Sequence, residues 1–222
     1  MNVIHLEVSM KRMMSIILVL SFAGVMIGVA QDAKLVQLPA PQTEIGKPLM
    51  QTLKLRQSSR VFDTKALPPQ ELSNLLWAAI GINRPESGKR TAPSAMNWQE
   101  IDVYVAMPEA LYLYDAKSNS LKAVLSKDLR EASGKQPFVK DAPLNLIYVA
   151  DATKMKNASE QDQMFYSAAD VGFIAQNVYL YCASQGLVAV MRGLVDRPVL
   201  AKAMNLRPEQ KVMFSQTVGY PK

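Results

Sequence analysis

The chain of 222 residues contains a single histidine, His5, and a single cysteine, Cys182. His5 lies in a stretch that has the pattern of a removable export signal, so we expect the mature chain to contain no imidazole. This absence excludes Ser-His-Asp and Cys-His nucleophilic sites, and also His-ligated zinc and non-haem iron sites. A lone cysteine excludes an intrachain disulfide framework and a cysteine-rich metal cluster. Any chemistry must use carboxylates, tyrosine, lysine, arginine, backbone amides or a cofactor with its own reactivity.

The N-terminal stretch has the three parts of a secretory signal. Met10-Lys11-Arg12 begins a basic segment, residues 13–29 are apolar apart from two serines and the glycines, and Gly28-Val29-Ala30 offers small residues before Gln31. We predict a signal peptide over residues 1–30 and a periplasmic or secreted mature protein with no stable membrane span. The alternative is a single membrane anchor, for which about 17 apolar residues are at the lower limit.

The remaining sequence has the size and composition of one globular domain. Removal of residues 1–30 leaves 192 residues with a net charge of 23 minus 18, or +5. Hydrophobic residues make up 49% of the whole chain, which argues against intrinsic disorder. Residues 31–45 contain two prolines and little periodicity, and we interpret them as a flexible N-terminal arm before one domain over residues 46–222. The modest charge, without a basic stripe that alternates with aromatics, argues against nucleic-acid binding.

The spacing of apolar residues predicts a mixture of helices and strands of the α+β class. Helices are predicted over 47–57, 68–81, 160–185 and 196–204. Strands are predicted over 101–106, 111–114, 121–125, 144–150, 187–191 and 211–218, and residues 83–97 are interpreted as a loop. Helices and strands do not alternate strictly, which argues against a doubly wound parallel sheet. The helix over 160–185 is apolar around most of its circumference, so we expect it to be packed on several sides.

The first candidate site segment is Arg56-Gln57-Ser58-Ser59-Arg60. Two guanidinium groups give charge-assisted, paired hydrogen bonds to phosphate oxygens, and Ser58 adds a neutral donor. The alternative for this segment alone is a solvated basic helix end, where arginine also complements the helix dipole.

The second candidate segment is the loop from Ala92 to Glu100. Asn97 and Gln99 present amide donors and acceptors that match the edge of a heterocyclic ring. Met96 and Trp98 offer apolar surface to a flat ligand. The alternative is an ordinary loop whose tryptophan fills part of the core.

The third candidate segment is the strand that begins after Gly186 and ends at Met191-Arg192-Gly193. A glycine at the end of a strand lets a backbone N–H approach a ligand atom closely. A plain strand end is the alternative for this segment taken alone.

Together, these segments resemble the nitroreductase-like FMN-dependent oxidoreductases, and within them the thiazole/oxazole-forming (SagB-type) dehydrogenases. The order of the motifs is more specific than any one of them. It comprises Arg-x-Ser-x-Arg at 56–60, Pro-Ser-Ala-x-Asn-x-Gln at 93–99, a Leu-Tyr-x-Tyr-Asp hairpin strand at 111–115, the long helix, the strand ending at Gly193, and Gly-Tyr-Pro at 219–221. The resemblance covers residues 46–222.

The resemblance implies a fold, a cofactor and a dimer. The implied fold is a mostly antiparallel central sheet flanked by helices, with one long central helix, and the implied cofactor is FMN bound between two protomers of a homodimer. The implied FMN-binding residues form three groups. Phosphate and ribityl contacts fall to Arg56, Ser58 and Arg60, contacts from the loop to Ser94, Asn97 and Gln99, and contacts near the reactive N5 atom to Arg192 and Gly193.

The chain departs from the family pattern at three positions. Glu100 stands where many relatives have proline, Arg192 stands where many nitroreductases have an acidic residue, and the sequence ends at Lys222, where many relatives continue with basic residues. A cation at Arg192 near the flavin ring would favour the reduced, anionic flavin or bind an acidic substrate.

The sequence thus predicts an exported FMN-dependent oxidoreductase that moves a hydride through flavin N5. Its small-molecule substrate and its electron donor or acceptor are left open. The alternative is a non-catalytic flavin-binding or interaction protein that keeps the fold.

Overall fold

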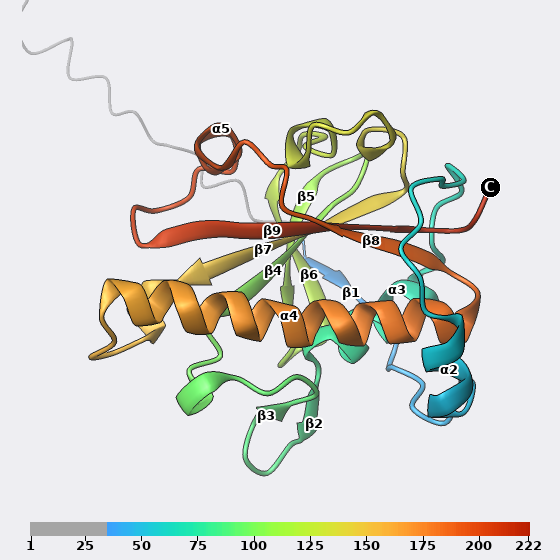
Figure 1. The fold of residues 1–222 in the computed structure, drawn as a ribbon, viewed down its shortest axis with the longest axis horizontal. Helices are drawn as coiled ribbons and strands as arrows, with labels where there is room; N and C mark the ends of the chain where they lie inside the picture. Colours follow the sequence, from blue (N-terminus) through green and yellow to red (C-terminus); the bar gives the residue numbers. More distant parts are fainter. Residues whose placement is uncertain (1–34) are drawn as a thin grey trace, which may run out of the picture. The chain divides into compact units, whose positions relative to one another are not determined.

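The computed structural model describes residues 35–222, which form one α+β unit around a seven-stranded sheet (Figure 1). The strand order is β1-β6-β5-β4-β7-β9-β8, and every neighbouring pair is antiparallel. The sheet strands are β1 (Leu35–Gln37), β4 (Ile101–Ala106), β5 (Leu111–Asp115), β6 (Ser120–Leu125), β7 (Leu144–Asp151), β8 (Val188–Arg192) and β9 (Gln210–Gly219). This mostly antiparallel sheet with flanking helices confirms the predicted fold class. The predicted signal peptide at residues 1–30 lies outside the described residues.

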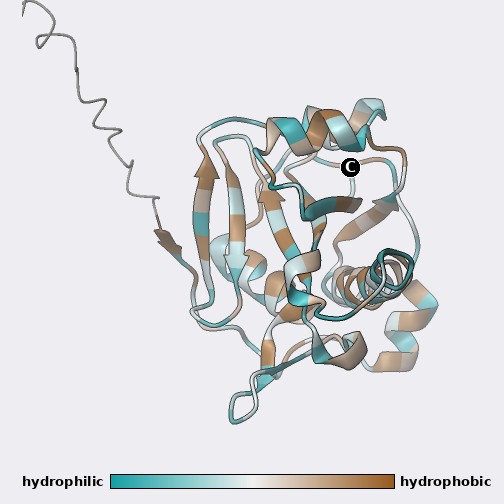
Figure 2. Ribbon diagram, turned by 90° about the vertical axis from the view of Figure 1, so that its left-hand side faces the viewer, coloured by the Kyte–Doolittle hydropathy of each residue, from teal (hydrophilic) through white to brown (hydrophobic). Residues whose placement is uncertain are grey.

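Both faces of the sheet are covered, because alternate side chains of the central strands enter two different cores. Val103 and Val105 of β4 pack in a core with α3 (Pro69–Ile80) and α4 (Glu160–Gln185), whereas Tyr104 points into a second core that contains Leu200 of α5 (Arg197–Ala203). Figure 2 shows α5 on one side of the sheet and α4, seen end-on, on the other. Burial on both faces explains why every residue of β7 is buried.

The long helix α4 has the bounds that the sequence predicts, and local chemistry explains both ends. The Ser159 side chain accepts a hydrogen bond from the Asp162 amide at the N-terminus. Gly186 follows the C-terminus in the left-handed conformation, with φ of 76°. The helix crosses one face of the sheet (Figure 1).

Within residues 35–222, only one face of α4 is packed against the rest of the domain. That face contains Val171, Ile174 and Val178, whereas Phe165 and Phe173 are exposed. The expectation that α4 is packed on several sides is therefore not met within residues 35–222. The hydrophobic pattern is present around the helix, but the described part of the chain leaves some of its apolar side chains exposed.

The N-terminal segment also differs from the sequence-based interpretation. Residues 35–45 are fixed to the domain and are not a free arm. Strand β1 pairs with β6, Leu38 is buried, and the amide of Gln42 donates to the Asn74 side chain. The helix α2 (Leu49–Leu55) then begins after Pro48, within the predicted range. A strand of three residues is too short to give a recognisable sequence period.

The predicted loop over residues 83–97 contains a small hairpin. Its strands are β2 (Ile82–Arg84) and β3 (Lys89–Arg90), and a single 3₁₀ turn follows at Ala95–Asn97. Further 3₁₀ turns lie at Glu131–Ser133, Pro137–Val139 and Ala152–Lys154. Within residues 35–222, no helix combines the length and the apolar character needed to cross a membrane.

Candidate functional site

The Arg56–Arg60 segment lies against the edge strand β8. The Ser59 amide donates to the Ala189 carbonyl at 3.0 Å, and Ser58 forms a parallel bridge with Ala189. Tyr179 of α4 links the two segments further, since its hydroxyl lies 2.9 Å from Ser58 Oγ and accepts from the Met191 amide at 2.7 Å. The structure therefore brings the first and third candidate segments together, with Tyr179 as the connection.

Arginine side chains make this segment a strong anion-binding candidate. The guanidinium of Arg56 lies 5.4 Å from the centre of the Tyr179 ring, and Arg60 is exposed. Neither arginine forms an ion pair with a carboxylate in the described part of the chain. Ser58 is exposed beside them. Two uncompensated cations and a hydroxyl match the chemistry of a phosphate group.

The end of β8 extends away from this cationic group. Gly193, the residue after the strand, is exposed. It lies four residues beyond Ala189, which corresponds to about 13 Å along an extended strand. One edge of the domain therefore presents an anion-binding group at one end and an accessible glycine backbone at the other.

The side chain of Arg192 lies in the core, away from this edge. Its guanidinium donates to Thr217 Oγ1 at 3.1 Å, to the Ser133 carbonyl at 2.8 Å and to Asn145 Oδ1 at 3.0 Å. Burial lowers the pKa of Arg192 to about 10, and the side chain is only 4% exposed. This placement differs from the expectation of a cation beside the flavin ring. Its guanidinium ties β8 to β7, β9 and the Ser133 turn.

The loop that contains Ser94, Asn97 and Gln99 has an unusual backbone. Met96, Asn97 and Gln99 have φ of 50°, 55° and 49°, in the left-handed region that non-glycine residues rarely occupy. Such conformations persist where the surrounding structure holds them, and they cluster at functional sites. Here Ser94 Oγ accepts from the Gln99 amide at 2.7 Å, and Asp170 Oδ2 accepts from the Ala95 amide at 2.9 Å.

A buried pair of carboxyl groups, Glu100 and Asp170, lies beneath this loop. Glu100 is fully buried beside Ser167 and Asp170, and within residues 35–222 neither of its carboxyl oxygens has a well-aligned hydrogen-bond partner. Burial raises the pKa of Glu100, and the neighbouring charge of Asp170 raises it further. Asp170 is 2% exposed, and burial raises its pKa against the opposing effect of the Ala95 amide. One proton on Glu100 therefore lets the pair remain buried while Asp170 holds the loop.

The loop and the Arg56–Arg60 segment lie on different sides of α4. The loop is anchored at Asp170, whereas the arginine segment is anchored at Tyr179. Nine residues of α-helix correspond to about two and a half turns and a rise of about 14 Å. The two anchors therefore point in opposite directions, and one chain does not bring all eight predicted site residues into one cavity.

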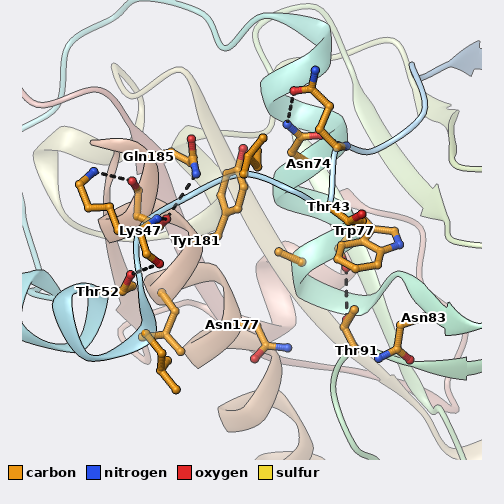
Figure 3. Close-up of a pocket in the computed structure, with 16 residues that line it drawn as sticks. Thr43, Lys47, Thr52, Asn74, Trp77, Asn83, Thr91, Asn177, Tyr181 and Gln185 are labelled. Atoms are coloured by element: carbon orange, nitrogen blue, oxygen red, sulfur yellow. Dashed lines mark hydrogen bonds between the residues drawn. The ribbon is translucent and has the colours of Figure 1, made fainter.

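Several cavities lie near these segments, and one of about 290 Å³ beside the arginine segment has Gln57, Tyr179 and Ala189 in its walls. A cavity of about 460 Å³ lies between residues 42–47, α2, α3 and α4, and Figure 3 shows Trp77, Tyr181 and Lys47 along it. It contains none of the predicted site residues, and the Lys47 ammonium is used to bind the Ser184 carbonyl. A cavity of about 230 Å³ lies instead between the β2–β3 hairpin and the loop, and its walls include Ser94, Asn97 and Gln99.

Sequence reasoning missed the side chains that support the site. Tyr179 and Asp170 both lie outside the three candidate segments, on the long helix α4. Arg90 of the hairpin donates to Gln99 Oε1 at 2.7 Å. The sequence feature that could have pointed to Arg90 is the cluster of Arg84, Lys89 and Arg90 around the Pro-Glu-Ser-Gly turn. No comparable sequence feature points to Asp170. Within the described residues, no group of three or more histidine, cysteine, aspartate or glutamate side chains could hold a metal ion.

Known proteins with similar sequences and structures identify the family. The sequence profile of the nitroreductase family matches residues 53–220. A Methanocaldococcus jannaschii protein named as a nitroreductase is 32% identical over 166 residues, which cover 68% of this chain and 83% of that protein. A crystal structure from Ralstonia eutropha JMP134, also named as a nitroreductase, is 45% identical with a TM-score of 0.82, and the match covers 87% of this chain and 92% of that chain.

More distant structures share the fold alone. A chain of the E. coli microcin synthetase complex McbBCD is 19% identical, with a TM-score of 0.65 over 86% of this chain and 79% of its own length. The NADPH:FMN oxidoreductase of Vibrio harveyi is 20% identical, with a TM-score of 0.59 over 78% of this chain and 69% of its own. The profile match and the two closer relatives show that this chain belongs to the nitroreductase family of oxidoreductases.

Proposed function

We propose that this protein is an FMN-dependent oxidoreductase that transfers a hydride through flavin N5 to or from a small substrate. The observation that carries the proposal is the pair of arginines, Arg56 and Arg60, held with Ser58 beside β8 and without carboxylate partners in the described residues. The residues present fit FMN, because a phosphate requires such donors. Bound FMN would supply the two-electron chemistry that this set of side chains lacks.

The residues of this chain would bind and orient the cofactor. Arg56 and Arg60 would hold the phosphate, with Ser58 as a neutral donor. The exposed backbone at Gly193 would face the reactive edge of the ring, about 13 Å further along β8. Tyr179 would fix the distance between the two regions, since its hydroxyl contacts both Ser58 and the Met191 amide.

We also propose that the complete site forms between two copies of the chain. The loop with Asn97 and Gln99 is anchored on the side of α4 opposite to Tyr179, so the loop that completes each site would come from the partner subunit. The exposed face of α4 supports this arrangement, since Phe165 and Phe173 are 68% and 48% exposed. Ala168, Ala169 and Gly172 beside them are small enough to let a second backbone approach.

The finer assignments are proposals that rest on the sequence. The Leu-Tyr-x-Tyr-Asp motif, which forms β5, supports membership in the thiazole/oxazole-forming (SagB-type) subgroup. The basic and apolar pattern over residues 10–30 supports export to the periplasm or the medium.

The first experiment is an absorbance spectrum of the purified chain from residue 31 to 222, with the supernatant of the denatured protein analysed for FMN. We expect close to one FMN per chain. The variant Arg56→Ala/Arg60→Ala should lose the flavin, whereas Lys122→Ala/Lys127→Ala removes two exposed cations elsewhere and should retain it. A folded protein that takes up no FMN in excess cofactor would overturn the proposal.

Turnover separates the enzyme from a flavin-binding protein without activity. The bound flavin should be reduced by NAD(P)H or by a chemical donor, and a nitroaromatic or quinone acceptor should reoxidise it under anaerobic conditions. Flavin that no donor–acceptor pair cycles would favour the non-catalytic alternative.

A further inference from the structure

We propose that the cavity between the β2–β3 hairpin and the 94–99 loop binds the anionic group, a carboxylate or a phosphate, of the molecule that exchanges electrons with the flavin. This inference rests on the proposed function and names the charge class of the molecule that would enter the same site. We call this cavity the hairpin pocket and define its walls by Arg84, Lys89 and Arg90 of the hairpin together with Ala92, Pro93, Ser94, Asn97 and Gln99.

The hairpin and the loop form one connected structure. Arg90 donates through Nε to Gln99 Oε1 at 2.7 Å and through Nη1 to the Ile80 carbonyl at 3.1 Å. Gln99 in turn donates through Nε2 to the Gly88 carbonyl at 3.2 Å. The position of the hairpin is therefore fixed relative to the loop that we place at the flavin. A group bound in the hairpin pocket would be held next to Asn97 and Gln99.

The hairpin pocket carries three positive charges and has no carboxylate in its walls. Arg84, Lys89 and Arg90 form no ion pair with a carboxylate in the described part of the chain. The guanidinium of Arg84 is nevertheless oriented, because it donates to the Arg90 carbonyl at 2.6 Å and to Asn83 Oδ1 at 3.0 Å. Three like charges around one concave surface concentrate a positive potential there and raise the local concentration of anions.

The side chain of Arg90 places one of the three positive charges in the partly buried wall of the hairpin pocket. Arg90 is half-buried, and burial lowers its pKa. Its hydrogen bonds to Gln99 and Ile80 use neutral oxygens, and the carboxylates of Asp102 and Asp115 act on its charge without forming an ion pair with it. An anion in the hairpin pocket would supply a direct countercharge. The hydroxyl of Ser94 and the amide of Asn97 add neutral polar groups to the same walls.

The volume of the hairpin pocket favours the charged end of a small molecule. Its volume is about 230 Å³. Complete ligand sites usually enclose roughly 300–1,000 Å³. The hairpin pocket therefore accommodates a carboxylate or phosphate with the adjoining part of a ring, and the rest of the molecule would extend toward the flavin. The hairpin pocket could therefore bind the anion of an acidic substrate, the role that the sequence suggested for Arg192, whose guanidinium lies in the core.

The test compares two ligands that differ in charge. Calorimetry at low salt would measure the binding of 4-nitrobenzoate and of its neutral counterpart 4-nitrobenzamide to the FMN-loaded protein. We expect the carboxylate to bind about tenfold more tightly, a difference that 0.5 M NaCl strongly reduces. The variant Arg84→Gln/Lys89→Gln should lose this preference, and Lys122→Gln/Lys127→Gln, which removes two exposed charges from another part of the surface, should keep it.

A parallel arm with NADPH identifies the source of the anion. Weaker NADPH binding in Arg84→Gln/Lys89→Gln would assign the hairpin pocket to a donor phosphate, and weaker nitrobenzoate binding would assign it to a substrate carboxylate. Equal affinity of the wild type for the charged and neutral ligands, together with unchanged NADPH binding in the variant, would overturn the inference. Equal thermal midpoints for both double variants and the wild type would verify that the folds are intact.

The same titrations on FMN-free protein separate this inference from the proposed function. If the protein binds no FMN but still prefers the carboxylate, only the proposed oxidoreductase function fails. If it binds FMN and shows no charge preference in either arm, only the hairpin pocket assignment fails.

Discussion

Replacement of Glu100 by glutamine should stabilise the protein at alkaline pH and have little effect in acid. Glu100 is fully buried without a well-aligned hydrogen-bond partner for either carboxyl oxygen within residues 35–222, and its neighbour Asp170 is also buried. Burial and the charge of Asp170 both raise the pKa of Glu100 in the folded state. Glutamine has nearly the same shape but carries no charge, and its amide can donate to the Asp170 carboxylate.

The direction of the pH dependence follows from proton binding. Between the unfolded pKa, about 4.3, and the raised folded pKa, the folded wild type binds more protons than the unfolded chain does. Its stability therefore falls as the pH rises through this window. The Glu100→Gln variant lacks this loss. The free energy of unfolding of the variant should equal that of the wild type at pH 4. At pH 8 it should be higher by about 1–3 kcal/mol, the usual penalty of an unsatisfied buried polar group.

Urea unfolding followed by tryptophan fluorescence at pH 4, 6 and 8 measures the free energy of unfolding of the wild type and of Glu100→Gln. Thermal midpoints give a second measure, with a shift of about 2–4 °C expected for each kcal/mol in a chain of this size. Glu209→Gln is the matched control, because Glu209 is exposed and has no ion pair among the described residues. Parallel stability profiles for the wild type and Glu100→Gln across this pH range would refute the reasoning.

Three further predictions concern other positions. Arg192→Met should lower the free energy of unfolding in urea by about 1–3 kcal/mol, because buried acceptors at Ser133 and Asn145 lose their guanidinium donors; an unchanged midpoint would contradict this structural role. Gly186→Ala should cost about 1–2 kcal/mol in thermal unfolding, because φ at Gly186 is 76°; a variant as stable as the wild type would exclude strain there. Cys182 should react with a thiol reagent at pH 8 only after unfolding, because the thiol is 1% exposed and burial raises its pKa; rapid labelling of the native protein would refute this.

The parts of the fold that depend on local sequence could be predicted from it. Helix α4, β4 and β7 are long enough to show a clear period or apolar run, and Ser159 and Gly186 end α4 through contacts within a few residues. The order of the motifs then led to the family. Each of these signals lies within one segment of the chain.

The remaining features depend on contacts between distant segments. The apolar pattern of α4 does not reveal which of its faces this chain covers. The direction of Arg192 depends on Thr217 and Asn145, which lie on two other strands. The hairpin at residues 82–90 has strands too short for a recognisable period, and its attachment to Gln99 adds a contact that no local pattern encodes.

The placement of Asp170 and Tyr179 on opposite sides of α4 has a genetic consequence. In the proposed dimer, each site would take its phosphate end from one copy and its loop from the other. A chain damaged at Arg56 and Arg60 and a chain damaged at Asn97 and Gln99 would each form inactive dimers. Mixed in equal amounts and reassembled, they should regain about a quarter of the wild-type sites, because half of the dimers would be mixed and each of these would have one intact site. Two alleles that fail alone would thus complement each other within one cell.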